Sequence, residues 1–389
     1  MKILVVCQYY YPEPFRIHEV CEELSARGHE VTVLTGLPNY PMGVIPEEYL
    51  NGQRRDEVVN GVRIVRVNET PRKEGKVGLA RNYVSYVWHA SLKALTLGRF
   101  DVTLVYQLSP VLMAIPAFVA RAVFKCRNIR LYCLDLWPES LVSMNISRNS
   151  LFFKFIKHVS RSIYNGVNVL GYTSEMFEDY FKNDLKLKQK NYRFIPQFAD
   201  SLFEDITPTV HEGINYVFAG NIGKMQSVET VIRAAALVND DRIRWHIVGD
   251  GFALEDVKKL AEELKVNDKV TFYGRLPVEK MPEFYAMADA MLVTLAKDKT
   301  ISYTLPGKVQ SYMAAARPIL ASADGETARV MDKAKCGMCV AAEDAEALAN
   351  AAIKMADANL AEYGRNASDY YKSNYSKKKH IDLMEELLK

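Results

Sequence analysis

The stretch INYVFAGNIGKMQS, residues 214–227, decides the fold class of this 389-residue chain. It has the pattern of a buried strand that runs into a glycine-containing loop and then into a helix. The stretch KILVVCQYYYPEP, residues 2–14, opens a similar pattern earlier in the chain. Further apolar runs of strand length follow, and their continuous hydrophobicity is typical of parallel strands buried on both faces. The sequence therefore predicts two doubly wound α/β domains in tandem. Ligands would lie in an interdomain cleft, beyond the carboxyl ends of the strands.

The remaining pattern places strands and helices in both halves of the chain. In the first half, strands are expected over 2–7, 31–35, 62–67, 101–106, 129–134 and 167–171, and helices over 16–27, 76–97 and 149–165. In the second half, strands are expected near 214–219, 243–248, 269–273, 290–295, 318–322 and 338–341, and helices over 227–238, 252–264, 279–287, 307–316, 343–356 and 359–371. A stretch without periodicity follows Pro196, which predicts domains over 1–198 and 199–375 and a separate amphipathic segment over 376–389.

The composition is that of a soluble globular protein, with 49% hydrophobic and 25% charged residues. A net charge of +3 is too small to argue for a nucleic-acid partner. The uncharged stretch 104–120 is shorter than the roughly 20 residues of a spanning helix and contains Pro110 and Pro116, so a strand, a turn and a buried helix are expected there. Polar residues interrupt the first apolar run, which excludes a signal peptide.

The cysteines fit a reducing compartment without disulfides: Cys7, Cys21, Cys126, Cys133, Cys336 and Cys339. The last two form a CxxC pair, but no second pair at similar spacing completes a zinc site. We interpret the pair as small residues around a glycine turn that enters a strand. No acidic DxD pair is present either, so neither a metal nor another cofactor is expected.

Three successive loops of the second half have the composition of a nucleotide-binding edge. In FAGNIGKMQS (218–227), glycines permit close approach of a ligand, the following helix directs its N–H groups at an anion, and Lys224 adds charge. IVGDGF (247–252) carries a GxG, and VTFYGRLP (270–277) brings Arg275 to a strand end. Each of these features alone also fits a plain turn or a solvated side chain.

The segment ISYTLPGKVQSYMAAARPILAS, residues 301–322, carries the strongest signal. Pro306 and Gly307 form the turn into a helix, which puts Lys308 in the first helical turn. A cation there opposes the helix dipole and is favourable only when an anion compensates it. Such a local conflict is typical of a functional site. The alternative is a lysine side chain that extends away into water.

In the first half, Asp135 of DLWPES (135–140) follows a predicted strand and therefore lies at a carboxyl strand end. It is expected to act as a base, to orient a hydroxyl, or only to cap the next turn. The helix SLFFKFIKHVSRSIY (150–164) combines an apolar stripe with Lys154 and Lys157. This pattern suits a helix lying on anionic lipid, and it equally suits a helix whose stripe packs on the sheet.

Together these segments resemble family 4 of the nucleotide-sugar glycosyltransferases, which have the GT-B fold of two facing Rossmann-like domains. The matching segments keep the family's order over nearly the whole chain: RGHEVTVLTG (27–36), PNYPMG (38–43), DLWPES, FAGNIG (218–223), IVGDG (247–251), VTFYGRLP and MAAARPILAS (313–322). PNYPMG with DLWPES is similar to a subgroup of bacterial O-antigen and capsule transferases, some of which are N-acetyl-fucosamine transferases. The resemblance also implies that the last helix returns to the first domain.

The resemblance implies roles for individual residues. Asp135 and Lys308 would be catalytic. The donor phosphate and sugar would be bound by Arg16, Gly220, Asn221, Ile222, Gly223, Lys224, Gln226, Thr304, Leu305 and Pro306, and the nucleoside by Gly249, Asp250, Gly251, Tyr273, Arg275 and Ser311. Two glutamates eight positions apart are common in the family, and here Tyr303 and Ser311 take their places. The family's Arg and Lys of the first loop fall on Asn221 and Gln226, and its histidine falls on or beside Leu134.

The implied function is a retaining, metal-independent hexosyl transfer from a UDP-sugar, expected to carry an N-acetylated hexosamine or deoxyhexosamine. The acceptor would be an undecaprenyl-diphosphate-linked sugar in bacterial surface polysaccharide synthesis. The expected location is cytoplasmic, peripheral on the inner face of the cytoplasmic membrane, with an anionic membrane surface as a partner. The alternatives are a nucleotide-sugar 2-epimerase of the same architecture and a non-catalytic scaffold that binds sugar nucleotides. A dehydrogenase is disfavoured, because no GxGxxG with a following acidic residue is present.

Overall fold

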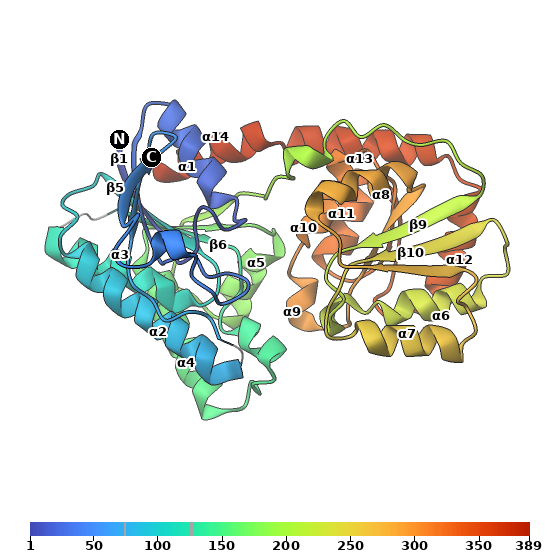
Figure 1. Ribbon diagram of the computed structural model, residues 1–389, viewed down its shortest axis with the longest axis horizontal. Helices are drawn as coiled ribbons and strands as arrows, with labels where there is room; N and C mark the ends of the chain where they lie inside the picture. Colours follow the sequence, from blue (N-terminus) through green and yellow to red (C-terminus); the bar gives the residue numbers. More distant parts are fainter. Residues whose placement is uncertain (74, 125–127) are drawn as a thin grey trace. The chain divides into compact units, whose positions relative to one another are not determined.

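The computed structural model describes residues 1–73, 75–124 and 128–389, and it divides the chain into two compact units (Figure 1). Unit 1 comprises Met1–Ile195 and Ile381–Lys389, and unit 2 comprises Pro196–His380. Each unit is a mostly parallel sheet between layers of helices, so the predicted doubly wound α/β class is confirmed. Of the cysteines named above, Cys126 lies outside the described residues.

The sheet of unit 1 has the strand order β3-β4-β2-β1-β5-β6-β7-β8. The strands are β1 (Lys2–Val6), β2 (Glu30–Thr35), β3 (Asp56–Val59), β4 (Val62–Arg66), β5 (Val102–Gln107), β6 (Ile129–Cys133), β7 (Val169–Tyr172) and β8 (Tyr192–Phe194). All neighbours pair in parallel except β3 and β4, which form an antiparallel hairpin. β3 and β8 were not predicted from the sequence, because both are short edge strands without a fully buried residue.

The helices of unit 1 cover both faces of this sheet. They are α1 (Ile17–Ala26), α2 (Gly75–Ala94), α3 (Ile115–Phe124), α4 (Leu151–Gly166) and α5 (Met176–Asp179), with short helical turns η1 (Glu47–Tyr49), η2 (Val111–Ala114), η3 (Glu139–Met144) and η4 (Tyr180–Asp184). The stretch 104–120 forms the expected strand, turn and helix. None of the described helices combines the length and the apolar character that a bilayer crossing requires.

Unit 2 contains a six-stranded parallel sheet in the order β11-β10-β9-β12-β13-β14. Its strands are β9 (Ile214–Ala219), β10 (Ile243–Val248), β11 (Val270–Gly274), β12 (Ala290–Thr294), β13 (Ile319–Ser322) and β14 (Gly337–Val340). The chain proceeds outward from β9 through β10 to β11, and then returns to the other side of β9 for β12. In such sheets ligands bind at this reversal, outside the carboxyl strand ends.

The helical elements of unit 2 pack two cores against the sheet. They are η5 (Ser201–Phe203), η6 (Lys224–Gln226), α6 (Glu229–Leu237), α7 (Leu254–Glu263), η7 (Val278–Lys280), α8 (Met281–Met287), α9 (Lys299–Ser302), α10 (Gly307–Ala314), α11 (Glu326–Ala334), α12 (Ala345–Ala356) and α13 (Leu360–Asn374). Tyr216 and Phe218 of β9 enter one core, whereas Val217 and Ala219 enter the other. The sequence analysis missed α9 and α11.

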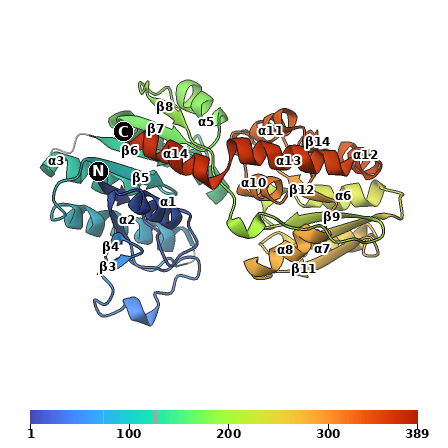
Figure 2. The same ribbon diagram turned by 90° about the horizontal axis from the view of Figure 1, so that it is seen from above.

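The last helix, α14 (Lys377–Leu388), contributes its final residues to unit 1, where it lies beside α1 (Figure 2). The Arg130 guanidinium of β6 donates a hydrogen bond of 2.8 Å to the Leu387 carbonyl. Arg27, which ends α1, forms ion pairs with Asp382 and Glu385 of the helix at 2.7 and 2.8 Å. The helix therefore completes unit 1 through both apolar and charged contacts.

Leu387→Ala should lower the free energy of unfolding of unit 1 by about 2–5 kcal/mol, because the Leu387 side chain is 2% exposed and its removal leaves a cavity. Glu386→Ala on the exposed face of the same helix is the matched control and should change the free energy by less than about 0.5 kcal/mol. Chemical denaturation followed by circular dichroism measures both. Equal stability of the two variants would show that α14 does not pack on unit 1 in solution.

Candidate functional site

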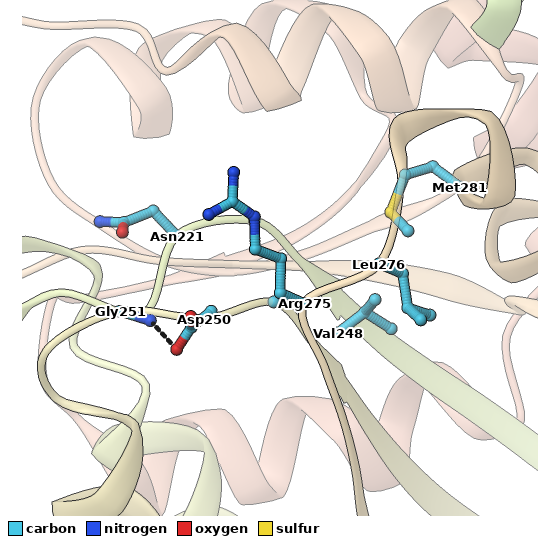
Figure 3. A pocket seen from close by; sticks show the side chains of 9 residues that line it. Asn221, Val248, Asp250, Gly251, Arg275, Leu276 and Met281 are labelled. Atoms are coloured by element: carbon cyan, nitrogen blue, oxygen red, sulfur yellow. Dashed lines mark hydrogen bonds between the residues drawn. The ribbon is translucent and has the colours of Figure 1, made fainter. Parts of the chain in front are cut away.

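A pocket of about 400 Å³ opens in unit 2 beyond the carboxyl ends of β9, β10 and β11 (Figure 3). It is lined by Gly220, Asn221, Val248, Gly249, Asp250, Gly251, Arg275, Leu276 and Met281. The three loops singled out in the sequence thus meet at one place, beside the reversal of strand order. Six of the predicted residues line the pocket together, and Val248, Leu276 and Met281 were not predicted. Nothing in the sequence around Leu276 and Met281 marks them as pocket residues.

The glycines of these loops are required by the packing of one loop on the next. Gly249 has φ +141°, and a Cβ atom there would collide with the carbonyl group of Gly220. A Cβ on Gly251 would likewise collide with the carbonyl group of Ile222. The GxG motif therefore brings the β10 loop against the β9 loop. It was expected to mark a turn, and its first effect is this contact between backbones.

Lys308 lies in the first turn of α10, as predicted, and its ammonium nitrogen is buried instead of reaching water. The Nζ atom lies 3.8 Å from the centroid of the Phe218 ring and has no hydrogen-bond partner among the described residues. Gly220 makes room for it, since a Cβ atom there would come within 3.1 Å of Nζ. Burial lowers the pKa of Lys308 to about 7. This amine is thus held beside the pocket, and no carboxylate in the described ranges is paired with it.

Polar side chains of the 220–227 loop form hydrogen bonds within the loop. The Gln226 side-chain oxygen accepts hydrogen bonds from the Gly223 N–H at 3.2 Å and from the Asn221 amide at 3.1 Å. The helix expected from residue 227 begins at Glu229, and a separate short helical turn, η6, precedes it. Lys224 lies in η6 with an exposed side chain and does not line the pocket.

Ile222 was predicted to contact the donor, and the structure gives it another role. Its side chain is fully buried in the core, its N–H donates to the Asp250 carbonyl at 2.8 Å, and its carbonyl accepts from the Ala253 N–H at 3.1 Å. These contacts use its polar groups and its side chain to join the β9 loop to the β10 loop. In the structure Ile222 therefore has a structural role, and its contact with the donor stays a prediction.

Other predicted residues of unit 2 lie outside the pocket lining. Ser311 is buried in α10, and its hydroxyl donates to the Gly307 carbonyl at 3.3 Å. The Tyr273 hydroxyl is 2.9 Å from His246 Nδ1, and its ring packs on Phe284 with centroids 4.8 Å apart. The turn before α10 contains the remaining three, which the structure does not bring into the lining: Thr304, Leu305 and Pro306.

In unit 1, Asp135 follows β6 and is held by a serine. The Ser109 hydroxyl donates to Asp135 Oδ2 at 2.8 Å, and the Trp137 indole N–H donates to the Ser109 oxygen at 2.9 Å. Burial raises the pKa of the Asp135 carboxyl, and the bond from Ser109 opposes that rise. The turn that follows begins at Pro138, so a capping role for Asp135 is excluded. Arg16 is half-buried and precedes α1 in the same unit.

The basic aromatic helix α4 buries only part of its predicted apolar stripe, which consists of Leu151, Phe152, Phe155, Ile156 and Val159. Its buried residues are Phe153, Ile156, Ser160, Ile163 and Tyr164. Of the predicted apolar stripe, Leu151, Phe152 and Phe155 remain 85%, 53% and 62% exposed. Ile156 of the stripe packs on the rest of the unit, whereas these three residues do not. Among the described residues, no group of three or more His, Cys, Asp or Glu side chains is placed to hold a metal.

Comparison with known proteins agrees with this architecture. Residues 15–197 match the family model described as glycosyl transferase 4-like domain, and residues 203–373 match the model described as glycosyl transferases group 1. The chain is similar to a probable glycosyltransferase WbjE from Pseudomonas aeruginosa, with 25% identity over 62% of this chain and 63% of that protein. It is also similar to the putative colanic acid biosynthesis glycosyl transferase WcaI of Escherichia coli K12, with 22% identity over 84% of each chain.

Solved structures share the fold over the full length. A sucrose-phosphate synthase from Thermosynechococcus elongatus superimposes with a TM-score of 0.78 at 17% identity, covering 99% of this chain and 98% of that one. Anabaena HepE, solved in complex with UDP, gives a TM-score of 0.71 at 15% identity, covering 100% of this chain and 99% of that one. The chain thus consists of a glycosyl transferase 4-like domain followed by a glycosyl transferases group 1 domain, on the GT-B fold of two Rossmann-like domains.

Proposed function

We propose that this protein is a glycosyltransferase that takes its sugar from a nucleoside diphosphate sugar bound by unit 2. The observation that carries this proposal is the amine of Lys308, which is buried beside the pocket at the carboxyl ends of β9, β10 and β11 and has no hydrogen-bond partner among the described residues. A buried cation without a partner is unfavourable, and a diphosphate supplies the missing charge. The solved HepE complexes, with UDP and with UDP-glucose, support a nucleotide of this kind.

The pocket residues suit the two parts of such a donor. The Arg275 guanidinium projects into the pocket in Figure 3, where Asp250 lies below it and Asn221 beside it. A nucleoside offers hydrogen-bonding edges and hydroxyls to such groups, while the diphosphate lies toward Lys308. We assign the donor as a UDP-sugar, carrying an N-acetylated hexosamine or deoxyhexosamine, from the resemblance to O-antigen and capsule transferases.

The reaction requires the protein mainly to supply positive charge near the diphosphate and to position the two substrates. The bond between the sugar carbon and the diphosphate oxygen breaks, the acceptor oxygen bonds to the same carbon, and the acceptor proton passes to a leaving phosphate oxygen. Lys308 stabilises the negative charge that develops on the diphosphate. In this proposal configuration is retained and no metal takes part. Asp135, fixed by Ser109, orients a sugar hydroxyl in unit 1.

The acceptor is proposed to be a sugar on undecaprenyl diphosphate, in the synthesis of a bacterial surface polysaccharide. One relative carries a name from that biology, since WcaI is named a putative colanic acid biosynthesis glycosyl transferase. We place the protein in the cytoplasm at the inner face of the membrane, with the exposed aromatic residues of α4 toward anionic lipid.

Calorimetric titration of UDP, GDP and ADP into the protein tests the donor assignment. UDP should bind, and GDP and ADP should bind at least about tenfold more weakly, because the pocket must read the base as well as the diphosphate. Arg275→Ala should reduce that preference, whereas Arg365→Ala on α13, outside the pocket lining, should not. Absence of binding by all three nucleotides would overturn the donor proposal.

A further inference from the structure

A second and larger pocket, of about 1020 Å³, lies wholly within unit 1. Its walls are α2 and α4, and both helices pack on η2, which supplies Leu112 to the pocket. It runs along α2 from Lys76 to His89, a length of about 20 Å at the rise of an α-helix. We refer to it as the α2–α4 groove.

The groove is almost entirely apolar, although it is open to solvent. From α2, Val77, Val84 and Trp88 are 68%, 62% and 65% exposed, and from α4, Phe152 and Phe155 are 53% and 62% exposed. Soluble proteins rarely expose a continuous apolar surface of this kind unless it binds something. Unit 1 does not cover these exposed side chains. The buried residues of α2, among them Tyr86 and Ala90, lie on another face of the helix and pack against the rest of the unit.

Part of the groove adjoins the Asp135 group, and we call this part the Asp135 end. Tyr83, Pro110 and Trp137 line it, and Trp137 donates to the serine that holds Asp135. Burial raises the pKa of the Tyr83 hydroxyl, Arg72 lowers it and Asp135 raises it, so both charged groups lie close to this residue. The groove thus leads from exposed aromatic side chains to the carboxylate that the proposed chemistry uses.

Among the described residues, Arg72 is a cation without a carboxylate partner at the Asp135 end. Its guanidinium donates to the Tyr9 hydroxyl at 3.3 Å and lies 5.4 Å from the centroid of the Tyr40 ring. No carboxylate pairs with it in the part of the chain that the structure describes. A half-buried guanidinium among tyrosine rings keeps its donors available for a phosphate, which is the anion that its planar geometry suits.

The charge of the groove walls is one-sided. α2 carries Lys76, Arg81 and Lys93 without a carboxylate, and α4 carries Lys154, Lys157 and Arg161 without one, in a chain whose net charge is only +3. A ligand for this groove therefore combines an apolar chain with negative charge. A neutral apolar metabolite would leave these positive charges without a counterpart, so it fits the groove less well.

We propose that the α2–α4 groove binds the single apolar chain of a lipid diphosphate acceptor, and that Arg72 binds its phosphate. The inference rests on the proposed function and deepens it, because it assigns this protein's own acceptor residues. With the chain along α2 and the phosphate at Arg72, the sugar beyond the phosphate comes to the Asp135 end. A lipid chain inserted in the groove differs from adsorption of the exposed helices on a bilayer, which needs no groove.

Farnesyl diphosphate is a suitable probe, because its isoprenoid chain and diphosphate represent both parts of such an acceptor. Two of the three tryptophans of the chain, Trp88 and Trp137, line the groove and report binding by their fluorescence. Farnesyl diphosphate should shift the emission to shorter wavelength as Trp88 leaves water, whereas pyrophosphate alone and farnesol alone should bind at least tenfold more weakly.

Ala80→Phe is the decisive variant. Ala80 is exposed and lines the groove, so the larger side chain fills the groove while it adds apolar surface. It should weaken farnesyl diphosphate binding roughly tenfold or more and leave binding to anionic vesicles unchanged or stronger. Ala26→Phe, at an exposed position of α1, is the matched control and should bind farnesyl diphosphate normally. Arg72→Gln should weaken farnesyl diphosphate and leave farnesol unaffected.

The outcomes separate this inference from the function on which it rests. Equal binding of farnesyl diphosphate by wild type and Ala80→Phe, with both forms pelleting with vesicles, would replace the inserted chain by simple adsorption. Absence of any farnesyl diphosphate signal would remove the acceptor assignment. In both cases UDP titration into the same samples still reports the site in unit 2, and loss of UDP binding in wild type would instead remove the proposed function. Thermal unfolding shows whether each variant is folded.

Discussion

Lys308→Ala is expected to weaken UDP binding by about 1.5–3 kcal/mol, or roughly ten- to 150-fold, because the variant loses a charge-assisted contact to the diphosphate. The Nζ atom has no partner among the described residues of the free protein, so its removal breaks no internal hydrogen bond. The variant should therefore fold at least as stably as the wild type. Lys354→Ala, at an exposed position of α12, removes the same formal charge far from the pocket lining and should bind UDP normally.

The same lysine should make UDP binding depend on pH. In the free protein its pKa is about 7, because burial favours the neutral amine, and a bound diphosphate raises that pKa. Between pH 7 and 9 binding should therefore take up a proton, and affinity should fall as pH rises, by up to about tenfold per unit. UDP itself stays fully ionised over this range, since a terminal phosphate has a second pKa near 6.

Calorimetry in two buffers with different ionisation enthalpies measures that proton uptake directly. Lys308→Ala and Lys308→Met should show neither the proton uptake nor the fall in affinity. If wild type binds UDP equally at pH 7 and pH 9 without taking up a proton, Lys308 does not contact the diphosphate.

Gly249→Ala should abolish the nucleotide pocket and lower the free energy of unfolding of unit 2 by about 3 kcal/mol or more. The new methyl group would collide with the Gly220 carbonyl, and φ +141° is unfavourable for any side chain. The β10 loop must then move away from the β9 loop, which separates the residues that surround the pocket. UDP binding should be lost even under conditions where the variant is still folded.

Gly274→Ala provides the matched control for backbone strain. Gly274 also has a positive φ, +68°, but its Cβ position is open, with no atom within 4 Å. This variant should lose only about 1–2 kcal/mol from its left-handed conformation and keep UDP binding. Denaturation curves and UDP titrations are measured for both variants. Gly274→Ala reports the effect of backbone strain alone, and Gly249→Ala reports backbone strain together with the collision. Similar losses in both would contradict the loop contact described here.

The strands and loops around the pocket of unit 2 were predicted well from the sequence, for physical reasons. Buried parallel strands give continuous apolar runs, so β9 and β10 were recognised within their bounds, and Lys308 stood out because its position opposes a helix dipole. What it does there depends on three-dimensional packing. Only the structure shows that Gly220 and Phe218 enclose the amine and keep it from water.

The α2–α4 groove could not be predicted in the same way. Its walls come from two helices that are separated in the sequence by two strands and another helix. A local sequence pattern does not indicate whether such distant segments leave a space between them. The stripe of α4 was recognised as apolar, but the sequence could not tell which part of it would be covered. Arg72 belongs to a loop without periodicity and becomes notable only through the tyrosines around it.

The division of unit 1 into two segments bears on how the chain folds during synthesis. All residues of unit 2 leave the ribosome before residues 381–389, which carry Leu387 and the carbonyl that Arg130 binds. Unit 2 has its complete sequence at that point, while unit 1 still lacks part of its core. Unit 1 therefore reaches its full stability only after residues 381–389 have been added, and a nascent chain stalled near residue 380 would expose the apolar surface that α14 covers.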